Sequence, residues 1–293
     1  MRFSHTIFAL PFAALAVVLS LVVDGVPQLS LTTVLLRCSG VLLCMVSARS
    51  AAMAFNRLVD AKIDAANPRT ASRHIPSGEL ARWQVTVFFG AMCAAFVGGC
   101  GLFWPNWLPI ALSVFVLAWI CGYSLAKRFT SAAHLWLGVA LAMSPICAWV
   151  AMRGEAVLLD PRDILPAIGL GAAIAFWVAG FDIIYACQDA QFDRDAKLHS
   201  VPARFGVAGA LRIAMVFHVL MLLILGGLPF AFPQLSFSWI YLVGYAVVAA
   251  LVVRQHSIVS ADDMRRVGEA FFTINAVISF GLCAAAALDS VLR

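Results

Sequence analysis

The chain has 293 residues, of which 63% are hydrophobic and only 12% are charged. A soluble protein of this size cannot bury so much apolar surface, and a disordered chain needs the opposite balance of low hydrophobicity and high charge. The net charge of +5 does not indicate a nucleic-acid partner, because Lys and Arg fall in short clusters between apolar stretches. The composition therefore predicts a polytopic protein embedded in a lipid bilayer.

Nine apolar stretches are each close to the length of about 20 residues that a helix needs to cross a bilayer. They are predicted at residues 6–23, 31–55, 83–103, 107–126, 133–152, 164–187, 208–231, 236–254 and 270–289. Spans and short loops fill almost the whole chain, so we expect an all-α membrane fold with a single domain over residues 1–293. We expect the first stretch to be a retained helix rather than a cleaved signal peptide, because its apolar run continues to residue 23.

The distribution of basic residues predicts the orientation in the membrane. Sixteen of the 20 Lys and Arg residues fall near the N-terminus or around the loops after the second, fourth, sixth and eighth spans. The positive-inside rule places that side in the cytoplasm and the C-terminus outside. We therefore expect an integral protein of a bacterial inner membrane, with its active site on the cytoplasmic side.

Two of these loops begin with similar acidic segments. Residues 60–64 read Asp-Ala-Lys-Ile-Asp, and residues 189–193 read Asp-Ala-Gln-Phe-Asp. Each segment follows an even-numbered span, and the two lie four spans apart in the same orientation. This spacing predicts two related halves of four helices, with a ninth helix added.

Polar side chains form two ladders at the ends of the second and sixth spans. The first ladder is Asn56, Asp60 and Asp64, and the second is Asp182, Tyr185, Asp189 and Asp193. Neighbours within a ladder are three or four residues apart, so on a continuous helix they lie close to one face, whereas Asp195 points to the opposite face. Carboxylates gathered at a membrane boundary repel one another unless cations neutralise them. Oxygen ligands of this kind suit Mg²⁺, which commonly bridges carboxylates to substrate phosphates.

Basic side chains in the same loops can bind phosphate oxygens. They are Arg69, Arg73, Lys127, Arg128, Lys197 and Arg204. Each alone is explained by the positive-inside rule, but acidic ladders and basic loops on one side together indicate a metal and diphosphate site. Arg49 lies two helical turns before Asn56 on the same face, about 10 Å deeper in the membrane. It is either a snorkelling arginine or a planar fork for the carboxylate of a second substrate.

These segments resemble the motifs of the UbiA superfamily of intramembrane prenyltransferases. Residues 49–78 contain N-x-x-x-D-x-x-x-D followed by R-T-x-x-R and P-x-G, and residues 182–193 read D-x-x-Y-x-x-x-D-x-x-x-D. Tyr123, Lys127 and Arg128 match a Y-x-x-x-K-R element, whereas His74 stands where many members have proline. The motifs are most similar to the branch of 4-hydroxybenzoate polyprenyltransferases, including members linked to menaquinone made by the futalosine route.

The resemblance implies transfer of a polyprenyl group from polyprenyl diphosphate to an aromatic acceptor acid in ubiquinone or menaquinone biosynthesis. The acceptor is a 4-hydroxybenzoate-like acid or, alternatively, a naphthoate. The implied Mg²⁺ ligands are Asn56, Asp60, Asp64, Asp189 and Asp193, and the implied substrate-binding residues are Arg49, Arg69, Arg73, Lys127, Arg128 and Lys197. Asp182 and Tyr185 are expected to orient the acceptor or take its proton, and Arg49 to bind its carboxylate.

A secondary transporter is the alternative from another class, because transporters also have related halves and intramembrane carboxylates. Transporters usually place these groups near the bilayer midplane, whereas the ladders here lie at one boundary beside basic loops. A phosphatidyl-alcohol transferase would need a D-G-x-x-A-R element, which the sequence lacks. Four histidines are isolated in the sequence and are expected to have packing or interfacial roles rather than to bind a metal: His5, His134, His218 and His256.

Overall fold

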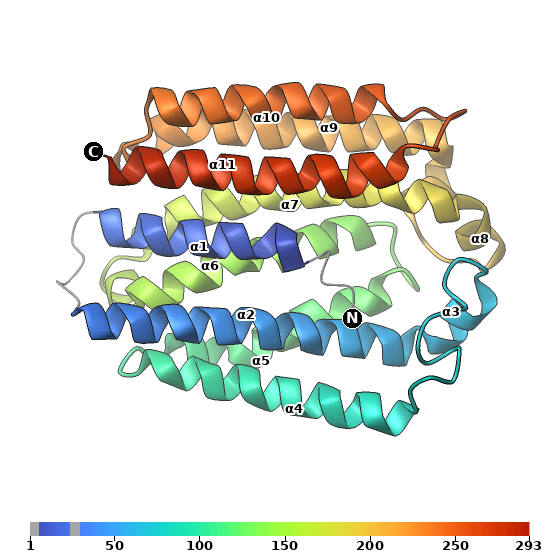
Figure 1. Cartoon of the computed structure of the whole chain (residues 1–293), viewed down its shortest axis with the longest axis horizontal. Helices are drawn as coiled ribbons and strands as arrows, with labels where there is room; N and C mark the ends of the chain where they lie inside the picture. The colour runs from blue at the N-terminus through green and yellow to red at the C-terminus, as the bar shows by residue number, and fades with distance from the viewer. Residues whose placement is uncertain (1–5, 24–29, 293) are drawn as a thin grey trace.

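The computed structural model describes residues 6–23 and 30–292, and nine long helices run side by side in this part of the chain (Figure 1). They are α1 (Thr6–Val22), α2 (Leu31–Val59), α4 (Arg82–Cys100), α5 (Leu108–Ala126), α6 (Ala133–Leu159), α7 (Leu165–Ala186), α9 (Val201–Ala231), α10 (Trp239–Ser257) and α11 (Ile274–Val291). Each corresponds to one predicted span, so the all-α membrane fold is confirmed. In the described residues, eight segments are long and apolar enough to cross a membrane, and α1 is slightly shorter at 17 residues.

Short elements connect these helices. They are the α-helices α3 (Ala61–Ala66) and α8 (Ala190–Asp195), the 3-10 turns η2 (Gly101–Phe103), η3 (Pro161–Ile164), η4 (Cys187–Asp189) and η5 (Pro233–Leu235), and the π-helical turn η6 (Glu269–Thr273). Helices α3 and α8 lie at the same end of the bundle (Figure 1). The two similar acidic segments are therefore brought to one end, as their spacing predicts.

The predicted helix ends differ from the observed ones where polar turns continue a helix. Helix α9 begins at Val201 rather than at residue 208, because Ser200 caps it by accepting a hydrogen bond from the Ala203 N–H group. Its second turn is interrupted at Gly206, whose φ of 69° is accessible to glycine without strain. Pro202, Arg204 and Gly206 break up the apolar run there, so hydropathy does not detect this part of the helix.

The prediction that each ladder lies on one continuous helix is wrong. Helix α2 ends at Val59 and α3 begins at Ala61, with Asp60 between them at φ −91° and ψ 2°. In the second segment Asp189 has a similar conformation, at φ −101° and ψ 5°. The Asp60 N–H group still donates to the Asn56 carbonyl at 3.0 Å. The interval of four residues between ladder members is therefore unchanged by one non-helical residue. For this reason the periodicity of the sequence does not reveal the break in the helix.

Helix α7 forms the centre of the bundle. Trp177, Val178, Ile183 and Ile184 on this helix are each at most 2% exposed. Helices α6 and α9 pack against α7, and α1 packs against α6 and α11. Because α7 carries Asp182 and Tyr185 near its end and continues into η4 and α8, this packing sets the position of the second ladder.

The closest approach of α6 to α7 is made through Gly138. A Cβ atom on this residue would lie 2.1 Å from the backbone oxygen of Ala175. Since backbone cannot move aside as a flexible side chain can, Gly138→Ala must push the two helices apart. We expect a loss of about 1–3 kcal/mol of stability, measured as a lower unfolding midpoint in detergent.

Gly90→Ala on α4 is the matched control for this prediction. No atom lies within 4 Å of a Cβ placed on Gly90, and alanine is a better helix former than glycine. Its unfolding midpoint should stay the same or rise. Equal midpoints for the two variants would contradict the close contact between α6 and α7.

Candidate active site

A cavity of about 240 Å³ opens at the end of the bundle that carries α3 and α8. Its polar lining residues are Arg49, Asn56, Arg57, Asp60, Asp64, Asn67, Arg69, Thr70, Arg73, Tyr123, Ser124, Lys127, Arg128, Asp182, Tyr185, Asp189 and Asp193. The structure thus brings together every predicted site residue except Lys197 and Arg204. Arg204 is exposed in the first turn of α9. Lys197 is exposed and has a left-handed backbone, with φ 53°, in the turn after α8. This turn takes its side chain away from the cavity lining.

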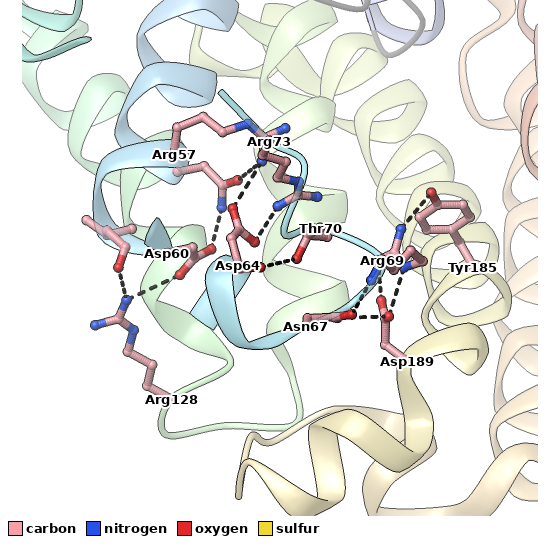
Figure 2. Close-up of polar contacts among 12 residues, drawn as sticks. Arg57, Asp60, Asp64, Asn67, Arg69, Thr70, Arg73, Arg128, Tyr185 and Asp189 are labelled. Carbon is pink, nitrogen blue, oxygen red and sulfur yellow. Dashed lines mark hydrogen bonds and ion pairs between the residues drawn. The ribbon is translucent and has the colours of Figure 1, made fainter. Parts of the chain in front are cut away.

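The loop after α3 reaches across the cavity to the second ladder (Figure 2). Asn67 Nδ2 donates to Asp189 Oδ1 at 3.2 Å, and Arg69 Nε donates to the same oxygen at 2.8 Å. Arg69 Nη2 pairs with Asp189 Oδ2, which makes the contact bidentate. This carboxylate raises the pKa of Arg69. Arg69 Nη1 also donates to the Tyr185 hydroxyl at 3.1 Å. One arginine therefore contacts both the carboxylate of Asp189 in η4 and the aromatic side chain of Tyr185 in α7.

Arginines also neutralise the first ladder. Arg73 Nη1 lies 2.6 Å from Asp64 Oδ1, and Arg128 Nη2 lies 3.2 Å from Asp60 Oδ1 (Figure 2). Asn56 Nδ2 donates to Asp60 Oδ2 at 2.8 Å. Burial raises the pKa of Asp60, because loss of water disfavours the charged carboxylate. The cavity therefore holds acidic and basic side chains in direct contact with one another.

Two buried carboxylate oxygens lack a hydrogen bond from the described residues. They are Asp64 Oδ2 and Asp193 Oδ2, one from each ladder. Their ion-pair partners are distant, with Arg57 Nη1 at 3.7 Å from the first and Lys127 Nζ at 4.0 Å from the second. A buried oxygen in this state is costly, and a hard divalent cation would satisfy it.

The acids do not surround a metal by themselves. Among residues 6–23 and 30–292, no group of three or more Asp, Glu, His or Cys side chains is arranged to hold an ion. Magnesium commonly keeps few protein ligands and takes the rest from water and substrate phosphates. The donor set therefore fits Mg²⁺ that arrives with a phosphorylated substrate.

Arg49 occupies the deep wall of the cavity. It also lines an adjoining apolar pocket of about 100 Å³, together with Met45, Tyr123, Met143 and Cys147. In the described part of the chain it has neither an ion pair nor a hydrogen bond, in contrast to Arg69, Arg73 and Arg128. A guanidinium in this position can bind an anionic group that lies between the two spaces.

Sequence reasoning missed several residues of the site. Asn67, Thr70 and Arg57 line the cavity, and Thr70 Oγ1 donates to the Asp64 carbonyl at 3.0 Å. Asn67 and Thr70 have a weak signal in the sequence, because polar residues near Pro68 resemble an ordinary turn. Arg57 resembles an ordinary basic residue at the cytoplasmic end of a span. The expectation that the histidines are isolated is also wrong for His134, His218 and His256, whereas His5 lies outside the described residues. His134 Nδ1 lies 2.7 Å from Asp182 Oδ2, and His218 and His256 contact each other.

A bundle of apolar helices with an acidic and basic cavity at one end defines an integral membrane protein whose site suits a metal-bound polyanion. Residues 7–277 match the UbiA prenyltransferase family, so the chain belongs to this family of magnesium-dependent transferases. Membership of this family excludes the alternative interpretation as a secondary transporter.

Curated relatives have low sequence identity to the chain. It is 26% identical over 262 residues to the 4-hydroxybenzoate octaprenyltransferase of Marinomonas sp. (strain MWYL1), which covers 88% of this chain and 84% of that protein. It is 30% identical over 199 residues to the polyprenyl transferase prhE of Penicillium brasilianum, which covers 65% of this chain and 59% of prhE. The chain thus spans less than two thirds of the length of prhE, and bacterial and fungal relatives are similarly distant.

Solved structures share the fold over nearly the whole chain. The apo structure of a UbiA homolog from Aeropyrum pernix K1 has a TM-score of 0.83 and 30% identity, and 99% of both chains is covered. A UbiA homolog from Archaeoglobus fulgidus bound to GPP and Mg²⁺ has a TM-score of 0.64 and 16% identity, covering 98% of this chain and 95% of that one. The second likeness concerns the fold alone.

Proposed function

We propose that this protein transfers a polyprenyl group from polyprenyl diphosphate to a hydroxylated aromatic acid, such as 4-hydroxybenzoate, in quinone biosynthesis. The observation that carries the proposal is one cavity that joins two acidic ladders, several arginines paired with them and Arg49 at its deep end. Acids and bases together suit a metal diphosphate, and the deep arginine suits a second, anionic substrate. We infer that this end of the bundle faces the cytoplasm, because most Lys and Arg residues lie there.

The two ladders would hold the metal. The proposed ligands are Asn56, Asp60, Asp64, Asp189 and Asp193. The buried oxygens of Asp64 and Asp193 that lack hydrogen bonds support this assignment. When bound, Mg²⁺ supplies Lewis-acid stabilisation of the diphosphate charge.

The basic residues bind the leaving group. Arg69, Arg73, Lys127 and Arg128 lie within reach of the ladder carboxylates, so they also lie within reach of phosphate oxygens held between those carboxylates. They stabilise the negative charge that develops as the allylic carbon–oxygen bond breaks and the diphosphate leaves with the electron pair.

Aromatic side chains protect the allylic cation. Phe8, Phe181, Tyr185 and Phe271 line the inner part of the cavity, and the rings of Tyr185 and Phe271 are 4.2 Å apart between centroids. Their faces stabilise positive charge, and their bulk excludes water that would otherwise capture the cation.

The acceptor acid binds at the deep end of the cavity. Arg49 binds its carboxylate, and Asp182 and Tyr185 orient the ring or take the proton that the ring loses. The adjoining apolar pocket beside Arg49 supports this placement, because an aromatic acid needs an apolar wall for its ring next to a cation for its carboxylate.

Product analysis tests the proposal. Membranes that contain the protein are incubated with labelled polyprenyl diphosphate, Mg²⁺ and either 4-hydroxybenzoate or a hydroxynaphthoate, and the products are identified by mass. We expect one prenylated acid, lost on chelation and restored by Mg²⁺. Formation of the prenylated naphthoate alone would show that the acceptor is the alternative one, a naphthoate of menaquinone biosynthesis. Loss of diphosphate from the donor without either product would contradict the proposed acceptor class.

A further inference from the structure

His134 links three helices directly behind the cavity. It lies in the first turn of α6 and is only 1% exposed. Its Nδ1 atom lies 2.7 Å from Asp182 Oδ2 on α7, and its Nε2 atom lies 3.3 Å from the Val201 backbone nitrogen at the start of α9. The imidazole thus contacts a carboxylate on one side and a helix N-terminus on the other.

The contact with Val201 determines which nitrogen carries the proton. A backbone N–H group can only donate, so Nε2 accepts and carries no hydrogen in this arrangement. The single N–H proton of the neutral ring is therefore on Nδ1 and points at Asp182. This N–H group satisfies one carboxylate oxygen and holds the plane of the carboxylate, as the second partner of a histidine does in other sites.

The position of Asp182 makes this contact relevant to the reaction. Its side chain is 22% exposed and lines the cavity, whereas the His134 side chain is buried behind it. The acid is therefore accessible to a substrate, and the histidine acts on it from the protein side. The hydrogen bond from Nδ1 therefore restricts rotation of the carboxylate that faces the substrate.

We propose that His134 is a positioning residue that fixes the Asp182 carboxylate for removal of the ring proton. The inference rests on the proposed function, in which Asp182 takes this proton. The ring carbon bonds to the allylic carbon, whose bond to the diphosphate oxygen breaks. The proton on that ring carbon then passes to the Asp182 carboxylate, and the electron pair of the C–H bond restores the aromatic ring. The Nδ1–H group of His134 donates its hydrogen bond to Asp182 throughout, and His134 neither gains nor loses a proton.

An isotope experiment separates this role from simple packing. The acceptor is deuterated at the carbon that receives the prenyl group, and product formation is compared with that from the unlabelled acid. In His134→Leu, we expect kcat to fall about 10-fold or more with little change in either KM. We also expect the deuterium isotope effect on kcat to rise above the wild-type value, because proton removal becomes the slower step. His134→Asn can present an amide N–H group near the Nδ1 position, and it should restore most of kcat.

His218→Leu is the matched control. His218 is also fully buried, with Nδ1 2.8 Å from His256 and Nε2 3.2 Å from the Trp177 carbonyl, but neither partner is a carboxylate. This substitution is expected to lower the unfolding midpoint without a change in the isotope effect. If His134→Leu does not fold, His134→Gln replaces it, because the longer amide matches Nε2 rather than Nδ1.

The outcomes separate the two proposals. An unchanged isotope effect in His134→Leu or His134→Gln would overturn the positioning role, as would a His134→Asn variant that is no more active than these. Wild-type protein that prenylates neither acid would overturn the proposed function itself, and the inference would fall with it. Wild-type transfer with an unaffected His134 variant would overturn the inference alone.

Discussion

Asp60→Ala and Asp189→Ala are each expected to abolish prenyl transfer without loss of folded protein from the membrane. These acids belong to different ladders and line the same cavity, so under the proposed metal assignment removal of either would leave Mg²⁺ short of a ligand. Loss of one well-placed electrostatic group costs about 100- to 1,000-fold in kcat in other enzymes, and a metal ligand should cost at least as much. The measurement is product formation in membranes at equal amounts of protein.

The ion pairs of these acids predict which kinetic constant changes in the alanine variants. Asp189 now neutralises Arg69, and Asp60 neutralises Arg128. Each alanine variant releases an arginine that can still bind phosphate oxygens. We therefore expect the loss to fall on kcat, while the donor KM changes little.

Asp195→Ala is the control for this pair. Asp195 lies on α8 beside the second ladder, but it is exposed and bonded to Gln191. This variant should keep wild-type activity. Substantial transfer by Asp60→Ala or Asp189→Ala would remove the metal assignment, whatever the control shows.

Arg49→Lys is expected to raise the KM for the acceptor far more than the KM for the donor. Lysine keeps the charge but loses the planar fork that binds a carboxylate through two parallel hydrogen bonds. A hydrogen bond to a charged group contributes about 1.5–3 kcal/mol, which corresponds to an acceptor KM about 10- to 100-fold higher. Steady-state kinetics with each substrate varied in turn provide the measurement.

Arg37→Lys is the matched control on the same helix. Arg37 lies toward the other end of α2, where its Nη1 atom donates to the Met152 carbonyl at 2.7 Å. We expect no change in the acceptor KM of this variant, although its stability falls. Equal increases of both KM values in Arg49→Lys would exclude a specific contact with the acceptor. They would favour the other interpretation of Arg49, a snorkelling arginine.

The fold could be predicted from the sequence to the level of its helices. Nine apolar stretches correspond to nine observed helices, because a bilayer accepts only segments that satisfy their own backbone hydrogen bonds. The exact ends of the helices were harder to predict. Pro202, Arg204 and Gly206 interrupt the apolar run at the start of α9, and the single non-helical residue Asp60 leaves the spacing of the ladder unchanged.

Much of the candidate site was also predictable, because spacing along one helix is a local property. The ladders and the basic loops were identified in this way, and all their predicted members except Lys197 and Arg204 line the cavity. Lys197 differs because its left-handed turn, rather than its position in a basic loop, decides where its side chain lies.

The amino-acid sequence by itself determined that the protein is a helical membrane protein and which short segments carry its acids and bases. These properties depend on hydrophobicity and on the repeat of a helix, both of which act over a few residues. Only the tertiary structure decided that Arg69 pairs with Asp189, that Arg49 lies between two cavities, and that His134 contacts Asp182. Those contacts join residues far apart in the chain, and close packing of whole helices decides which distant side chains meet.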